Sequence, residues 1–398
     1  MKRRKMELKR IIFSLLFFVV IVSLGFSQQF NFVVFGDNRP FNNEDPQPQI
    51  FKEIVQNVEW IHPDFVVDVG DLIYGYGADA QRTRQEYMDF LNVVKIFSMP
   101  FYTVVGNHDV AGIGGQKYYE TLLKKPLYYS FDYEKSHFIL LDTNVNFPNG
   151  KFTQKQYNWL VKDLNSATSA QNIFFFMHKP LHEYQDYSQN AWADKFMAKK
   201  VDDLITHFNS KHHNIRMVFQ GHEHLYWRTE FNGIIYMITG GTGASLAEEP
   251  QNGGFYHFVL VTVNGTHVKT NVLLPGYFSV KYLNSNSGTS DKVMVVVENH
   301  LPSVYEGLSV KGLKFVMPEA SFYKVSGNIP CKIWKITRNS DGTADVWVEA
   351  NLDFNSLSVK SVFKAALSAL ILHKIPNISS FENISRLTQD IITVSVSH

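Results

Sequence analysis

Cysteine is almost absent from this sequence. The 398-residue chain contains one, Cys331, which follows Pro330 in a strand-like run. A single cysteine excludes an intramolecular disulfide, so packing or bound metal must hold the fold even in an oxidising compartment. Its place in a strand-like run predicts a buried and unreactive thiol.

An excess of positive charge is also missing. The formal net charge is +1, and the first ten residues alone carry +5, which leaves −4 for the rest of the chain. A nucleic-acid-binding protein normally presents a basic surface. The charge therefore excludes nucleic acid as the expected partner.

Long apolar runs are absent except near the N-terminus. The segment from Ile11 to Phe26 carries no charge and follows a basic stretch, and the small residues Gly25 and Ser27 precede Gln28. This run is shorter than the ~20 apolar residues of a membrane span. Its pattern predicts a signal peptide over residues 1–27 and an extracytoplasmic location. An uncleaved N-terminal membrane anchor is the alternative.

The remaining length of about 370 residues predicts two domains. Strand-like and helix-like patterns alternate over residues 28–275. A polar stretch within residues 276–290 predicts a linker. Residues 291–398 contain short strand-like runs with weak helical periodicity, which predicts a smaller, mostly β domain of unknown role.

Polar side chains that can bind metal follow five strand-like runs of the first domain. They are Asp37; Asp71 with Tyr74; Asn107, His108 and Asp109; His178; and His222 with His224. In open α/β sheets, functional groups gather at the carboxyl ends of strands. Carboxylate, amide and imidazole ligands around a bridging carboxylate suit a site with two ions ~3.5–4 Å apart.

The order of these motifs resembles the calcineurin-like metallophosphoesterases. That family has Asp-x-His, Gly-Asp, Gly-Asn-His-Asp/Glu, a lone His and Gly-His-x-His. The similarity extends from about Phe30 to Leu274. It implies an α/β (α+β) sandwich of two mixed sheets flanked by helices, followed here by the C-terminal β domain.

The first motif departs from the family pattern. It reads Asp37-Asn38-Arg39, so an arginine stands where the family has a metal-binding histidine. Arginine stays charged and offers no lone pair. The second motif, Gly70-Asp71-x-x-Tyr74, resembles the purple acid phosphatase branch, in which the tyrosine phenolate binds a ferric ion. The alternative is that Tyr74 only packs in its loop.

The resemblance also implies a role for each motif residue. The ligands of metal one would be Asp37, Asp71, Tyr74 and His224, and those of metal two Asp71, Asn107, His178 and His222. His108 would be the general acid, oriented by Asp109. Arg39 would either grip a phosphate oxygen or form a structural salt bridge.

These features predict a secreted, dinuclear metal-dependent phosphoesterase that hydrolyses phosphate monoesters. Its cofactors would be two ions of iron, zinc or manganese, and its partner a small phosphorylated substrate. Phosphodiesterase or nucleotidase activity at the same site is one alternative. A degenerate binding protein is another, because Arg39 interrupts the family pattern.

Overall fold

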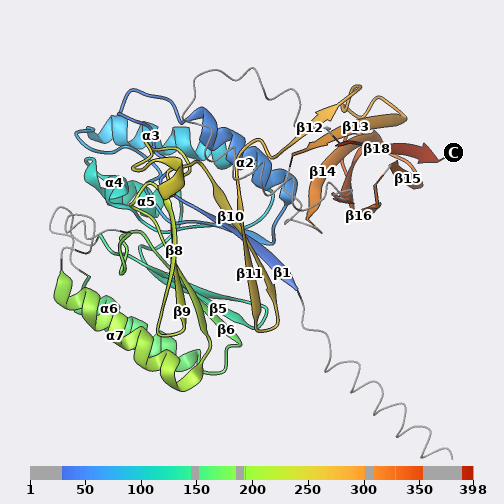
Figure 1. Ribbon diagram of the computed structural model, residues 1–398. Coiled ribbons are helices and arrows are strands. Elements are labelled where there is room, and N and C mark those ends of the chain that lie inside the picture. The colour runs from blue at the N-terminus through green and yellow to red at the C-terminus, as the bar shows by residue number, and fades with distance from the viewer. Residues whose placement is uncertain are drawn as a thin grey trace, which may run out of the picture.

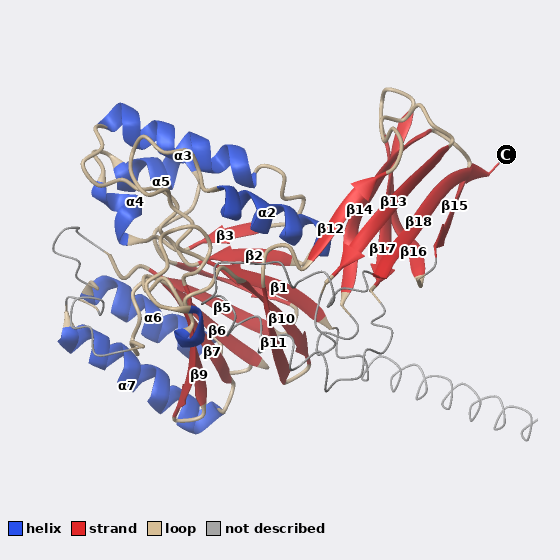
Figure 2. Ribbon diagram, turned by 45° about the horizontal axis from the view of Figure 1, so that its top comes forward, coloured by secondary structure: helices blue, strands red, loops and turns tan. Residues whose placement is uncertain are grey.

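The computed structural model describes residues 29–144, 152–184, 192, 194–300, 308–327, 329–352 and 388–397. Two mixed sheets pack face to face, with helices on their outer faces and a smaller group of strands at one end (Figures 1 and 2). The predicted fold class is confirmed. The expected signal peptide, residues 1–27, lies outside the described residues.

The first sheet has the strand order β11-β10-β1-β2-β3. Three of its strands run parallel, and β10 is antiparallel to both of its neighbours. Their bounds are β1 Phe30–Phe35, β2 Phe65–Asp68, β3 Phe101–Thr103, β10 Phe258–Asn264 and β11 His267–Leu273.

The second sheet has the order β4-β5-β6-β7-β9-β8, with four parallel strands in its centre. All six residues of β6 are buried, as expected of a parallel strand covered on both faces. The bounds are β4 Tyr129–Tyr133, β5 Ser136–Leu141, β6 Asn172–Met177, β7 Ile215–Gln220, β8 Tyr226–Phe231 and β9 Ile234–Thr239.

Helices cover the outer face of each sheet (Figure 1). Those beside the first sheet are α2 Gln49–Ile61, α3 Ala80–Val94, α4 Asn107–Ala111 and α5 Gly115–Leu122. Those beside the second are α6 Gln154–Ser166 and α7 Lys195–His212, and a 3₁₀ turn, η1, spans Pro250–Asn252. Thr153 is the N-cap of α6, since its side chain accepts a hydrogen bond from the amide of Gln156.

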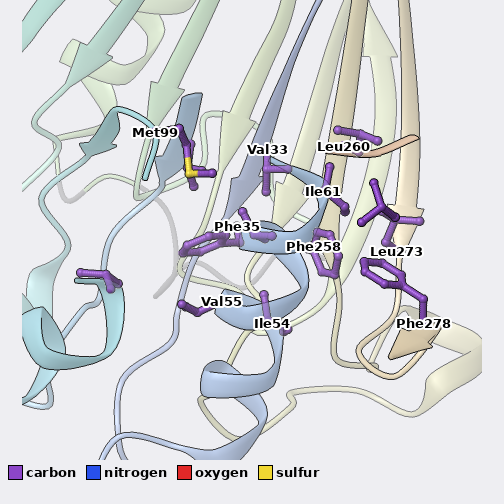
Figure 3. Close-up of a cluster of buried hydrophobic side chains, with 14 of the residues drawn as sticks. Val33, Phe35, Ile54, Val55, Ile61, Met99, Phe258, Leu260, Leu273 and Phe278 are labelled. Carbon is purple, nitrogen blue, oxygen red and sulfur yellow. The ribbon is translucent and has the colours of Figure 1, made fainter. Parts of the chain in front are cut away.

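Phenylalanine rings fill the space between the two sheets. Phe32 of β1 stacks on Phe65 of β2 with ring centroids 5.1 Å apart, and Phe138 of β5 meets Phe32 edge-on at 5.5 Å. A second core lies between the first sheet and α2, where Val33 and Ile54 belong to one buried cluster (Figure 3). Strand β1 is therefore packed on both of its faces.

The C-terminal strands form two further sheets, in the orders β12-β13-β18-β15 and β14-β17-β16. Their bounds are β12 Phe278–Tyr282, β13 Lys292–Asn299, β14 Ser309–Pro318, β15 Phe322–Gly327, β16 Cys331–Arg338, β17 Thr343–Asn351 and β18 Thr388–Ser397. The expected linker, residues 276–290, contains β12, which pairs with β13. Its apolar side chain Phe278 is buried, so part of that segment belongs to the sheet.

Two glycines lie where the backbone turns tightly or packs closely. The dipeptide Asn232-Gly233 connects β8 and β9 with φ values of 52° and 72°, as expected of a type I′ hairpin turn. At Gly312, β14 approaches α2 so closely that a Cβ atom would collide with the carbonyl oxygen of Glu59.

Candidate metal centre

The predicted site residues come together at one edge of the sandwich. Asp37 and Asp71 follow β1 and β2 of the first sheet, and Asn107 begins α4 just after β3. The second sheet contributes His178 directly after β6, and His222 with His224 after β7. Five chain segments from two sheets thus supply the side chains.

Three of these residues have left-handed backbone conformations. The φ angles are 57° at Asp37, 61° at Asp71 and 72° at His222. Such values are uncommon outside glycine, and non-glycine examples cluster at functional sites. The turns after β1, β2 and β7 therefore hold a strained backbone that directs these side chains toward one another.

Glycines allow the loops to approach closely. A Cβ atom at Gly221 would lie 2.7 Å from Oδ2 of Asp37, and one at Gly106 would collide with Oδ1 and the amide of Asp71. The loop at Gly240 also packs against Oδ2 of Asp37, where a Cβ would lie at 2.7 Å. Side chains larger than hydrogen at these positions would push the ligand loops apart.

One group of ligand atoms surrounds Nε2 of His178. Oδ1 of Asn107 lies 3.1 Å from it, Oδ1 of Asp71 3.2 Å and Nδ1 of His222 3.2 Å. Asp71, His178 and His222 form one of the carboxylate–histidine groups compact enough to hold a metal ion. These are the four residues that the family resemblance implies as ligands of metal two.

The hydrogen bonding of His178 shows that this group fits a cation. Its Nδ1 lies 2.9 Å from the carbonyl oxygen of Val69 and donates its proton there. Nε2 faces the other acceptor atoms, where it carries a proton when no metal is bound and would offer its lone pair to a bound cation. This outer hydrogen bond fixes the tautomer, as is typical of metal-ligating histidines. These acceptor atoms converge on one point, which a proton of His178 or a bound cation can occupy.

A second group shares Asp71 with the first. Asp37, Asp71 and His224 place ligand atoms within 4.8 Å of one another, and Nε2 of His224 lies 3.5 Å from Oδ1 of Asp37. Nδ1 of His224 donates to the carbonyl oxygen of Ser245 at 2.7 Å, so its Nε2 also presents a lone pair. Asp71 therefore has the position of a bridging carboxylate.

The electrostatics of the site centre on Asp71. Burial raises the pKa of its carboxyl group, but His178, His108 and Arg39 lower it more, so that the pKa lies well below its usual range. Burial opposes the charged form of His178 as well and so lowers its pKa, but the carboxylates of Asp71 and Asp37 outweigh this effect and raise the pKa to about 9. The site attracts positive charge strongly.

Arg39 lies against the bridging carboxylate. Its Nε is 3.8 Å from Oδ2 of Asp71, and its guanidinium carbon is 5.6 Å from the centre of the Tyr74 ring. One terminal nitrogen donates to the carbonyl oxygen of Pro40 at 3.0 Å. An ion pair is one of the two roles given above for Arg39, and its grip on a phosphate oxygen stays a prediction.

His108 also faces the shared carboxylate, but Asp109 does not hold it in the expected way. Nδ1 of His108 donates to the carbonyl oxygen of Tyr74, while its Nε2 lies 3.8 Å from Oδ2 of Asp71. Burial lowers the pKa of His108, and Asp71 partly offsets this effect.

The carboxylate of Asp109 instead accepts the amide protons of Asp71, Leu72 and Gly106, at 3.1, 2.9 and 2.6 Å. Burial, and then the nearby charge of Asp71, raise the pKa of Asp109 to about 7. The expectation that Asp109 orients His108 is corrected: Asp109 ties the Asp71 loop to the start of α4.

Tyr74 lies beside the site, and Tyr76 is a neighbour that sequence reasoning missed. The centre of the Tyr74 ring is 5.5 Å from that of the His108 ring, and the guanidinium group of Arg39 lies over the Tyr74 ring. The hydroxyl of Tyr76 accepts a hydrogen bond from Nδ2 of Asn107 at 3.3 Å. No motif or periodicity in the sequence marks Tyr76.

Residues 30–226 match the family model for calcineurin-like phosphoesterases. This chain is a calcineurin-like metallophosphoesterase. It is therefore a hydrolase acting on phosphoric ester bonds. Members of this superfamily generally bind two metal ions, in keeping with the two ligand groups that share Asp71.

Relatives of this metallophosphoesterase include both phosphatases and phosphodiesterases. It is 25% identical over 213 residues to a probable glycerophosphodiester phosphodiesterase GpdQ of Arcobacter nitrofigilis, covering 50% of this chain and 70% of the relative. It is 29% identical over 167 residues to purple acid phosphatase 23 of Arabidopsis thaliana, covering 36% of this chain and 34% of that one. Human tartrate-resistant acid phosphatase type 5 is 22% identical over 251 residues, covering 54% and 74%.

None of the helices in the part of the chain that the structure describes is long and apolar enough to span a membrane.

Proposed function

We propose that this protein is a dinuclear metal-dependent phosphatase that hydrolyses small phosphate monoesters. The observation that carries the proposal is the pair of ligand groups that share Asp71, with the imidazole of His108 beside them. Asp37, Asp71 and His224 would hold one ion, and Asp71, Asn107, His178 and His222 the other. Tyr74 as a further ligand to the first ion remains a prediction.

Two bound ions would supply charge neutralisation at the phosphoryl oxygens and a water of lowered pKa. The protein supplies geometry and proton transfer. Asp109 holds the Asp71 loop, and the carbonyl oxygen of Val69 fixes the ring of His178. These outer contacts keep the ligands in place before substrate arrives.

His108 is the proposed general acid. Its Nδ1 proton is engaged by the carbonyl oxygen of Tyr74, so Nε2 is the atom that exchanges a proton with substrate. That atom lies 3.8 Å from the bridging carboxylate, within reach of an ester oxygen bound at the centre. In its imidazolium form, His108 would donate the Nε2 proton to the leaving alkoxide as the P–O bond breaks, and the neutral ring would keep its Nδ1 proton.

Metal analysis combined with a substrate panel tests the proposal. Purified protein should contain about two metal ions per chain, and it should release phosphate from alkyl and aryl monoesters. A chelator should abolish the activity, and added iron, zinc or manganese should restore it. Faster cleavage of diesters than of monoesters would favour the phosphodiesterase alternative, which the similarity to GpdQ supports. Metal-free, inactive protein would overturn the proposal.

We also propose that the protein is exported and cleaved near Ser27–Gln28. Support comes from the basic start and the uncharged run from Ile11 to Phe26. Mass spectrometry of the N-terminus of protein from native cells should find Gln28 or a close neighbour first. Membrane-bound protein that retains Met1 would instead establish the anchor.

A further inference from the structure

We infer that Tyr76 is a positioning residue for the second metal ion, acting through the carboxamide of Asn107. The inference rests on the proposed function, because it assigns a role within the same centre. Oδ1 of Asn107 lies 3.1 Å from Nε2 of His178, and Nδ2 donates to the hydroxyl of Tyr76 at 3.3 Å. The two ends of one amide thus face the ligand group and the tyrosine.

Burial makes this second contact important. Asn107 is only 6% exposed, so an amide N–H without a partner would be costly there. The hydroxyl of Tyr76 accepts that N–H and fixes the plane of the carboxamide. Oδ1, the atom that can bind a cation, then stays directed at Nε2 of His178. Rotation of the amide would place a donor where the ion needs an acceptor.

The loop of Tyr76 is itself held on several sides. The amide of Tyr76 donates to the carbonyl oxygen of Tyr74 at 2.8 Å, and its own carbonyl oxygen accepts from Nδ2 of Asn43 at 2.9 Å. Between them, the amide of Gly75 donates to Oε2 of Glu86 at 2.9 Å. The tyrosine hydroxyl is therefore presented from a fixed backbone.

The ring of Tyr76 has a separate contact. Its centroid lies 4.5 Å from that of His108 in an edge-on arrangement. Replacing Tyr76 with phenylalanine preserves this packing and removes only the hydroxyl. The substitution thus separates the effect on Asn107 from any effect on the general acid.

The experiment measures metal affinity in Tyr76→Phe by competition with a chelator, together with metal content. Loss of an outer contact to a ligand typically lowers metal affinity 10–100-fold. We expect about a tenfold loss for one of the two ions, with the other unchanged. The dependence of rate on leaving group should remain that of the wild type. Tyr118→Phe, at a half-buried tyrosine of α5, is the matched control.

A double substitution tests whether Tyr76 acts through the amide. In Asn107→Asp both terminal atoms are oxygens, so orientation no longer matters. Adding Tyr76→Phe to that variant should leave its metal affinity unchanged or raise it. Equal losses in both backgrounds, equal loss of both ions, or an unchanged affinity in Tyr76→Phe would each overturn the inference. Wild-type protein without metal would overturn the proposed function as well.

Discussion

At the scale of single residues, the role of His108 is open to a direct test. His108→Ala should lower kcat by ~10²–10⁴ for an alkyl phosphate, because the leaving alkoxide needs a proton. A nitrophenyl phosphate, whose leaving group needs none, should lose less. Steady-state kinetics on both substrates, with metal content measured in parallel, checks this. Equal losses, or loss of metal, would assign His108 a different role.

Tyr74 is a second residue whose role can be tested, since it either binds a metal ion or only packs in its loop. If its phenolate binds a ferric ion, iron-loaded protein should be pink or purple through a tyrosinate-to-iron charge-transfer band. Tyr74→Phe retains the ring that packs on Arg39 and His108, and it should abolish the band and weaken one metal site. Visible spectroscopy and metal titration measure both effects.

A colourless iron-loaded wild type, together with full metal content and rate in Tyr74→Phe, would assign the residue to packing. The first ion would then be held by Asp37, Asp71, His224 and water.

The sequence predicted which ligand side chains the structure brings together, because each follows a strand. It failed for Asp109. The family resemblance implied that Asp109 orients His108, yet consecutive residues on a helix point in different directions. The carboxylate of Asp109 thus reaches the amide of Asp71 while the imidazole of His108 reaches Tyr74. The place of Tyr76 depends on how two loops meet, which no local pattern encodes.

At the scale of elements, the close approach of two loops can be tested at Gly106. Its φ of −91° suits any residue, so alanine there would add only a methyl group against Asp71. Gly106→Ala should reduce metal content and activity by displacing the Asp71 loop, while circular dichroism stays that of the wild type.

Gly233→Ala is the control, since its φ is +72° but a Cβ there would meet nothing within 4 Å. It should cost some stability through backbone strain and leave metal binding intact. Full metal content in Gly106→Ala would show that the loops can separate without loss of the site.

The elements themselves were mostly predictable. Apolar runs that end in Gly-Asp or His form buried strands, and Asn232-Gly233, a dipeptide typical of type I′ turns, forms the turn between β8 and β9. Residues 276–290 were expected to form a linker, because the polar residues of a loop dominate the segment and hide the strand at its start. Its five-residue strand β12 is fixed by pairing with β13 and by burial of Phe278, which are contacts distant in sequence.

At the scale of the whole molecule, His137 should make stability depend on pH. It lies near the start of β5, the end of the parallel strands opposite to the one that leads to His178, and contacts Asp132 at 2.6 Å and Asp163 at 2.8 Å. Burial lowers the pKa of His137, but the hydrogen bonds to Asp163 and Asp132 outweigh it and raise the pKa above its ordinary value.

Because the folded state binds this proton more tightly than the unfolded state, the stabilisation is full below pH ~6.5 and is lost as pH rises through the folded pKa. The difference in Tm between wild type and His137→Gln should therefore shrink from pH 5.5 to pH 8. His267→Gln, at an exposed histidine of β11, serves as the control. A difference that is constant with pH would refute the linkage.

The position of the Asp37 carboxylate between the two sheets also has a consequence for how the molecule unfolds. This carboxylate belongs to the first sheet, yet it accepts the amide proton of His222 from the second sheet, 185 residues away, at 2.9 Å. Each ligand group contains side chains from both sheets. An ion bound there would therefore act as a reversible cross-link between the sheets in a chain that has no disulfide. Neither sheet could then unfold without releasing the ion, and melting should become less cooperative when a chelator is present.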